Sequence, residues 1–134
     1  MNEMADRFAS LEKTIAEKKG DFSLFALFLP EDAPDRWDLL VAAPWASQNR
    51  DETVEYLVTE IKSHLGPQEL INLSRIVVVE PNHPAVQKFT KTFPVEHGKV
   101  EVRDSIFFGL PIRHAFIITA KSPEAKSPAV PVAK

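Results

Sequence analysis

The stretch Phe22–Leu29, FSLFALFL, decides the fold that we expect for this chain. It is apolar at every position except Ser23, so a strand formed here presents apolar side chains on both of its faces. This pattern is typical of a central strand that is covered on both sides. The sequence therefore predicts a sheet that contains this strand and has helices packed against it.

The second predicted strand is Trp37–Ala43, WDLLVAA. Its apolar side chains include an alternating set that shares one face of the sheet. That set is Trp37, Leu39, Val41 and Ala43. Residues 30–36, PEDAPDR, are too polar and too rich in proline to form an element of their own. We expect the two strands to form an antiparallel hairpin with a long acidic loop.

A strand–helix–strand unit follows. Its helix is predicted to run from about Asp51 to Leu65, where Gly66-Pro67 stops it. Residues 67–73 are expected to add a short helix. The run Arg75–Glu80, RIVVVE, contains consecutive β-branched residues, which is typical of a buried strand. This order predicts that the two strands of the unit are parallel and joined by a right-handed crossover.

The last third of the chain predicts a helix and a second hairpin. The helix begins at Pro84 and ends near Thr92. Strands are expected over Lys99–Phe107 and Ile112–Ala120, antiparallel across a turn that contains Gly109. Alternate side chains of the final strand are predicted to share one face. They are Ile112, His114, Phe116, Ile118 and Ala120.

Residues 2–19 predict a helix with a narrow apolar stripe on a strongly charged background. The stripe consists of Met1, Met4, Phe8, Leu11 and Ile15. Such a stripe either covers the sheet of its own domain or pairs with the same helix of a second copy. We expect a homodimer in which this helix does both.

The predicted elements run in the order α-β-β-α-β-α-β-β. The expected fold class is α/β, in the mixed α+β sense, with one mixed five-stranded sheet and helices packed on it. Residues 1–120 are predicted to form this single domain. Residues 121–134, KSPEAKSPAVPVAK, are predicted to be a disordered tail because they offer no periodic apolar face.

The composition excludes several classes of protein. The 134 residues include no cysteine, which excludes disulfides, thiolate zinc sites, iron–sulfur clusters and thiol nucleophiles. The first residues lack the apolar segment of a secretory signal, and the longest apolar stretch is far shorter than the ~20 residues that span a bilayer. We expect a soluble cytoplasmic protein with no membrane contact and no cofactor.

Charge is distributed unevenly. Residues 21–60 carry nine acidic and two basic side chains, whereas residues 81–134 carry eight basic and four acidic ones, and the whole chain has a net charge of −3. An acidic chain lacks the broad positive field that nucleic-acid binding needs, so we expect no such partner. A local basic group could bind a small anion, or could simply be solvated. It consists of Lys88, Lys91, Lys99, Arg103 and Arg113.

The four glycines exclude phosphate-binding loops. They lie at least eleven residues apart, so neither the dinucleotide-binding nor the P-loop pattern can form. The sequence also lacks the HExxH pattern of metalloproteases and the GxSxG pattern of serine hydrolases. These absences remove most nucleotide-dependent and hydrolase functions.

The first catalytic candidates are Glu80 and His83, in the segment EPNHP after the β-branched run. Ligands bind α/β sheets at the carboxyl ends of parallel strands, so these side chains could form an acid–base pair or bind a metal. The structural alternative is that Asn82 or His83 caps the helix beginning near Pro84, while Glu80 ends the strand in solvent. The sequence favours this alternative, and we expect no metal here.

Three other positions are candidates. His97 could bind a ligand, or could stand in a tight turn where Gly98 supplies a positive φ. His114 lies on an apolar face, where it could be a hydrogen-bonded core residue or a catalytic partner of Glu80. Trp45 follows a predicted strand and is the aromatic residue most expected to line a pocket.

No pattern in the chain resembles a known family, and two classes of function remain. The first is a non-catalytic binding or interaction module, acting as a homo-oligomer or as a subunit of a larger assembly. The second is a small hydrolase-type enzyme with a His/Glu site, with or without a metal. Missing catalytic signatures favour the module, and whether the chain is an enzyme stays open. Two histidines and a carboxylate meeting in one concave site would favour the enzyme.

Overall fold

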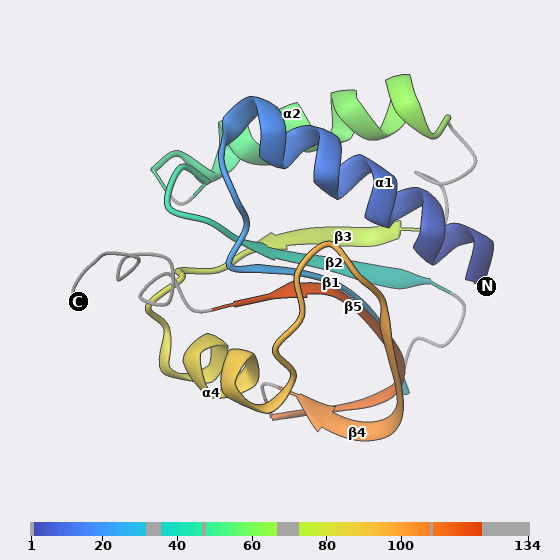
Figure 1. Cartoon of the computed structure of the whole chain (residues 1–134). Coiled ribbons are helices and arrows are strands. Elements are labelled where there is room, and N and C mark those ends of the chain that lie inside the picture. The colour runs from blue at the N-terminus through green and yellow to red at the C-terminus, as the bar shows by residue number, and fades with distance from the viewer. Residues whose placement is uncertain (1, 32–35, 47, 67–72, 108, 122–134) are drawn as a thin grey trace.

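A computed structural model of the chain describes residues 2–31, 36–46, 48–66, 73–107 and 109–121. The five strands form one sheet in the order β3-β2-β1-β5-β4, with helices on both faces (Figure 1). The fold class is therefore the mixed α/β class that the sequence predicts. The elements are α1 (Asn2–Lys19), β1 (Leu24–Pro30), β2 (Trp37–Ala42), α2 (Arg50–His64), β3 (Leu73–Val78), α4 (Pro84–Thr92), β4 (Val100–Phe107) and β5 (Leu110–Ala120).

Strand β1 is the centre of the sheet, as its apolar sequence predicts. It pairs antiparallel with β2 on one side and with β5 on the other. Strand β2 pairs in parallel with β3, and β5 pairs antiparallel with β4. Both predicted hairpins and the predicted parallel pair are confirmed. Because β2, β3 and β5 run in the same direction, their carboxyl ends lie at one edge of the sheet.

Two separate cores lie on the two faces of the sheet. On the face covered by α1 and α2, called the α1–α2 face, Phe25, Leu27 and Phe116 pack against Phe8 of α1 and Leu57 of α2. The prediction that Trp37, Leu39, Val41 and Ala43 share one face is confirmed, because all four belong to this core.

The opposite face, called the α4 face, carries a smaller core beneath α4. There, Leu24, Ala26 and Phe28 of β1 pack with Val86 and Phe89. Figure 1 shows α1 and α2 side by side over one face, whereas α4 lies alone across the other, next to β4. Cover on both faces is what the predicted central strand requires.

The apolar stripe of α1 is used by the chain itself. Phe8, Leu11 and Ile15 are buried in the α1–α2 core, and Met4 packs against that core. The alternative in which the helix covers its own sheet is therefore confirmed. Within the described residues, no helix is both long enough and apolar enough to cross a membrane.

Strand β3 differs from the prediction. The β-branched run was expected to be a buried strand, but β3 is an edge strand, and Ile76 and Val77 are only half-buried. β-branched residues suit a pleated surface that is only half-buried, so such a run can form an edge strand as well as a central one. The short helix expected over residues 67–73 falls outside the described residues, except for Leu73, which begins β3.

Strand β5 also differs, because it contains two irregularities in its pairing with β1. Register shifts lie between Phe25 and Ala26 and between Leu29 and Pro30. Each shift breaks the two-residue alternation of side chains. As a result Ile112 and Ala120, which were expected on the face of Phe116, belong to the core of the α4 face.

Residues 122–134 of the predicted tail lie outside the described residues. Lys121, which we assigned to the tail, is described and is fixed to the sheet. Its backbone N–H donates to the carbonyl of Ser23 over 2.9 Å, and its ammonium binds Asp21.

Candidate functional site

Glu80 and His83 do not form a joint site. The backbone of His83 donates to the Glu80 carbonyl, but the two side chains have different partners. Glu80 accepts from Arg50 over 3.2 Å, and His83 Nδ1 accepts from the backbone N–H of Ala85 over 3.1 Å at the start of α4. The capping alternative is therefore confirmed for His83.

His114 is a buried residue of the α1–α2 face, in contact with the rings of Trp37 and Phe116 at centroid distances of 5.6 and 4.7 Å. Its Nε2 lies 2.6 Å from a carboxylate oxygen of Glu101, which also accepts from Arg103 over 2.8 Å. The hydrogen bond with His114, followed by that with Arg103, lowers the pKa of Glu101. The two hypothetical catalytic partners therefore have separate partners of their own. His114 pairs with Glu101, and Glu80 pairs with Arg50.

The histidines do not converge. His64 pairs with Glu60, and the other three histidines have the separate partners described here and below. The basic group is dispersed too. Lys99 binds Asp6 of α1 over 2.8 Å, while Arg113 is exposed on β5. No multi-histidine site forms among the described residues, and the positions of Lys99 and Arg113 agree with the alternative of paired or solvated basic side chains.

An open cavity of about 990 Å³ lies between α4 and the second half of β4. We call it the α4–β4 cavity. Phe89, Phe93 and Phe107 form its apolar wall, with the Phe89 and Phe107 rings edge to face at 4.9 Å. Ile106 stands at the same cavity with 73% of its surface exposed, and it is the exposed large hydrophobic residue of the described chain.

Two charged side chains of opposite sign, Lys88 and Asp104, line this cavity. Lys88 lines it from α4, and no acidic residue occurs in α4, PAVQKFTKT. Asp104 lines it from β4, where its backbone has φ of +50°. A positive φ is uncommon for a residue other than glycine and marks an irregular point in the strand. The cavity thus combines an aromatic wall with a helix whose charged residues are basic, while Asp104 adds a negative charge from β4.

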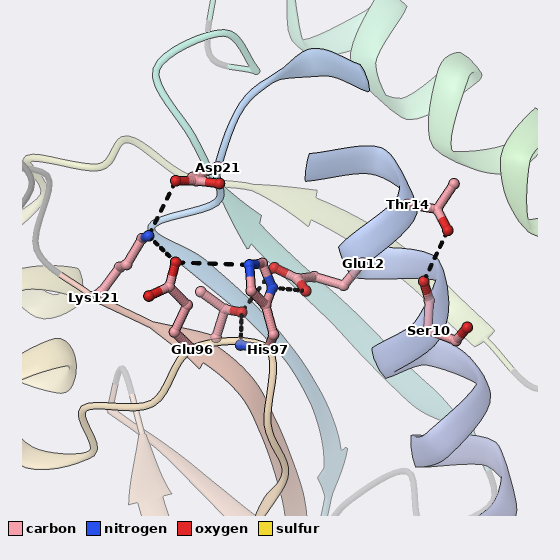
Figure 2. Close-up of polar contacts among 8 residues, drawn as sticks. Ser10, Glu12, Thr14, Asp21, Glu96, His97 and Lys121 are labelled. Carbon is pink, nitrogen blue, oxygen red and sulfur yellow. Dashed lines mark hydrogen bonds and ion pairs between the residues drawn. The ribbon is translucent and has the colours of Figure 1, made fainter. Parts of the chain in front are cut away.

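A second site lies where β5 ends and β1 begins. Glu12 of α1 is fully buried and lies 2.7 Å from His97 Nδ1. Its other oxygen accepts from the hydroxyl of Thr119 over 2.8 Å. The Thr119 hydroxyl oxygen in turn accepts from the backbone N–H of His97 over 3.1 Å. Figure 2 shows Glu12 and His97 facing one another from the helix and the loop before β4.

The loop at His97 differs from the predicted turn. The positive φ belongs to His97, at +52°, rather than to Gly98. Gly98 instead donates its N–H to the carbonyl of Ile118 over 2.9 Å. The strained backbone of His97 is held in place by two contacts: its ring contacts Glu12, and its backbone N–H donates to Thr119.

Lys121 completes this second site. Its ammonium binds Asp21 over 3.1 Å and also binds Glu96, so it lies between two carboxylates (Figure 2). Burial by itself would lower the pKa of Lys121, but the hydrogen bonds to Glu96 and Asp21 outweigh burial and raise its pKa. The full set, called the β5-end cluster, is Glu12, Asp21, Glu96, His97, Thr119 and Lys121.

Trp45 lines pockets beside this cluster, as predicted. Its indole N–H donates to the Gly20 carbonyl over 2.9 Å, and two cavities of about 350 and 360 Å³ share its ring. The Lys19 ammonium lies 6.0 Å from the Trp45 ring and 4.8 Å from the Tyr56 ring. Burial, with a smaller contribution from the charge of Glu60, raises the pKa of Tyr56.

Sequence reasoning identified His97 but missed its partners. One signal was available: Glu12 lies four residues after Phe8 and three before Ile15, so a carboxylate occupies the apolar stripe of α1. A charged residue on a buried stripe requires a polar partner from elsewhere in the chain. No comparable signal marked Asp21, Glu96 or Lys121, which meet only in the folded chain.

The chain has no significant match among protein-family models, curated proteins or solved structures. Its function must therefore be inferred from its own residues. The α4–β4 cavity and the β5-end cluster are the two features of the described chain from which a function can be argued.

Proposed function

We propose that the protein is a non-catalytic interaction module, which receives an apolar side chain of a partner protein in the α4–β4 cavity. The observation that carries this proposal is the aromatic wall of an open cavity, formed by Phe89, Phe93 and Phe107, beside an Ile106 that is 73% exposed. Exposed apolar groups in a concave, polar-rimmed site mark interaction surfaces in water-soluble proteins. A cysteine-free chain fits the reducing cytoplasm, where we place the module.

Charge complementarity indicates the chemistry of the partner. Lys88 and Lys91 project from a helix that has no acidic residue, on a chain whose net charge is negative. A partner segment that carries Asp or Glu next to its apolar anchor would place those carboxylates near Lys88, the lysine that lines the cavity. Complementary charges of this kind set specificity and association rate more than affinity. The proposed partner is therefore an acidic segment with an apolar anchor.

The hydrolase alternative has less support. Its strongest feature is the contact of His97 with the buried carboxylate of Glu12, an arrangement that can orient an imidazole for acid–base chemistry. The other imidazole nitrogen lies 3.7 Å from Glu96, and no described hydroxyl is a hydrogen-bond partner of the His97 ring. Since no second histidine joins it, the observation that would favour an enzyme is missing.

The experiment that tests the proposal selects peptides from a random displayed library on the full chain. We expect selected peptides to share an apolar residue flanked by Asp or Glu. Their affinity, measured by fluorescence polarisation, should fall at least ~10-fold in Ile106→Asp and in Lys88→Glu, the size of loss typical of an interface anchor. The matched control is Lys62→Glu, which makes the same charge change on exposed α2.

Two outcomes would contradict this function. Peptides that bind Ile106→Asp and Lys88→Glu as well as the wild type would place the interaction elsewhere. A wild-type dimer in light scattering that dissociates in Ile106→Asp would make a second copy, rather than a partner protein, the occupant of the cavity. That outcome would fit the homo-oligomer expected from the sequence but not the heterologous partner proposed here.

A further inference from the structure

We propose that the β5-end cluster is a binding site for a divalent metal ion of the zinc class, with His97 Nε2 and the carboxylates of Asp21 and Glu96 as ligands. One ligand atom from each of these residues lies within 4.8 Å of the others. His97 Nε2 and a Glu96 oxygen are 3.7 Å apart. Ligand atoms bound tetrahedrally at ~2.0–2.2 Å are ~3.3–3.6 Å apart, so small side-chain rotations suffice. The site shares no residue with the α4–β4 cavity and does not rest on the proposed function.

The first independent observation is the way in which His97 is held. Metal-bound histidines characteristically donate their second ring N–H to a carboxylate, which fixes the tautomer and the orientation of the ring. Glu12, at 0% exposure, lies 2.7 Å from His97 Nδ1, so the other ring nitrogen, Nε2, is free of Glu12 and lies 3.7 Å from Glu96. Glu12 itself accepts a hydrogen bond from the hydroxyl of Thr119, and the oxygen of that hydroxyl accepts one from the backbone N–H of His97.

The second observation is that a cation already lies between the two carboxylates. Lys121 Nζ is 3.1 Å from Asp21 and in contact with Glu96. The ammonium shows that this position attracts positive charge. A metal bound here would replace it, so Lys121 competes with the metal.

The charges of the cluster leave room for a dication. Asp21, Glu96 and Glu12 supply three carboxylates, whereas Lys121 supplies a single ammonium. A divalent ion carries twice the charge of an ammonium, so a site that gathers several carboxylates attracts the divalent ion more strongly.

The site is also reachable from solvent. The side chains of His97, Glu96 and Asp21 are 29%, 47% and 32% exposed. Three protein ligands leave the fourth position of a tetrahedral ion for water or for a ligand. A nitrogen and two carboxylate oxygens favour zinc and cobalt over magnesium, which prefers oxygen ligands alone.

Cobalt(II) alone is the probe, titrated into the full chain without any histidine tag and followed by visible absorption. We expect one ion per chain, with the absorption of a four- or five-coordinate site. Affinity should fall by more than ~100-fold in His97→Ala, which loses a ligand, and by ~10–100-fold in Glu12→Gln, which loses the group that orients it. Because Glu12 is buried, circular dichroism must show that its variant folds; exposed Glu96→Gln provides a ligand test that does not touch the core.

The distinguishing variant is Lys121→Met. Removal of the competing ammonium should tighten cobalt binding by ~10-fold, whereas a lysine unrelated to the site would leave affinity unchanged. His64→Ala, which alters an exposed histidine paired with Glu60 on α2, is the matched control and should bind as the wild type does. Absent cobalt absorption in both wild type and Lys121→Met, or binding insensitive to His97→Ala and Glu96→Gln, would overturn the proposal.

Discussion

The two faces of the sheet are covered to different extents. The α1–α2 face is closed by helices of 18 and 15 residues, and Phe8, Ile15, Phe25 and Phe116 on it are 0% exposed. The α4 face is covered by one helix of 9 residues, and there Phe89 and Phe107 remain 5% and 8% exposed beside a cavity.

Helix length explains this difference. At about 1.5 Å of rise per residue, α1 is roughly 27 Å long and α4 roughly 14 Å, so α4 alone cannot span the sheet. The comparison teaches that the closed face fixes polar groups such as Glu12 against a buried core, whereas the open face leaves Ile106 exposed beside a cavity. Substitutions on the two faces should therefore have unequal effects.

The largest effect is expected from Phe8→Asp, which tests whether α1 belongs to the core. The change removes a fully buried ring and introduces a carboxylate into the core of the α1–α2 face. Ring loss alone costs ~3–5 kcal/mol, and the unpaired charge adds to this, so most of the stability of a typical domain is lost. Circular dichroism at 25 °C should show an unfolded or aggregated chain. A folded monomer would instead mean that Phe8 serves a contact between copies.

The next effect compares Phe25→Ala with Phe89→Ala, the same change on the two faces. Phe25 is enclosed in the α1–α2 core, so its loss leaves a closed void and should cost ~3–5 kcal/mol. Phe89 borders an open cavity, where water can enter, and its loss should cost ~1–2 kcal/mol less. Urea unfolding measures both free energies. Equal losses would show that the α4 face is as tightly closed as the other.

A smaller effect is expected from Thr119→Val, which keeps the shape of the side chain but removes its hydroxyl. Glu12 then loses a donor and the His97 N–H loses its acceptor, both near the closed core. Buried groups left without partners cost ~1–3 kcal/mol, seen as a lower melting temperature. Thr92→Val, on an exposed hydroxyl of α4, is the control and should change the melting temperature little. A stable Thr119→Val would mean that the network does not hold the loop.

The smallest effect concerns Glu101, at the exposed margin of the α1–α2 face. Its folded-state pKa is lowered by His114 and Arg103 from an ordinary value of 4.5. Its contribution to the free energy of unfolding is therefore complete above that value and is lost as the pH falls through the lower, folded-state pKa. The melting temperature of the wild type should exceed that of Glu101→Gln at pH 7, and the difference should shrink toward pH 3. A constant difference would disprove this coupling.

Local sequence patterns determined most of the fold. The apolar run at Phe22–Leu29 required a strand covered on both faces, and the alternation of Trp37–Ala43 identified its core-facing side chains correctly. Turn residues and strand order predicted both hairpins and the parallel pair. These predictions succeed because burial, helix caps and turns depend on residues close together in the chain.

The position of β3 in the sheet was decided by tertiary structure. A β-branched run specifies an extended backbone, but not whether its strand lies at the centre or the edge. The irregularities of β5 also depend on its pairing with β1. They place Thr119 opposite Phe25, on the face from which Glu12 approaches, although simple alternation from Phe116 would turn it away.

Both candidate sites arise in the same way. Glu12 and His97 are 85 positions apart, and Asp21 and Lys121 are 100 apart, so no local pattern relates them. The α4–β4 cavity exists because a short helix and an edge strand leave space between them, which depends on packing rather than on any one segment. Local periodicity determined which segments become strands and helices, whereas contacts between distant segments decided where polar groups meet and where apolar side chains stay exposed.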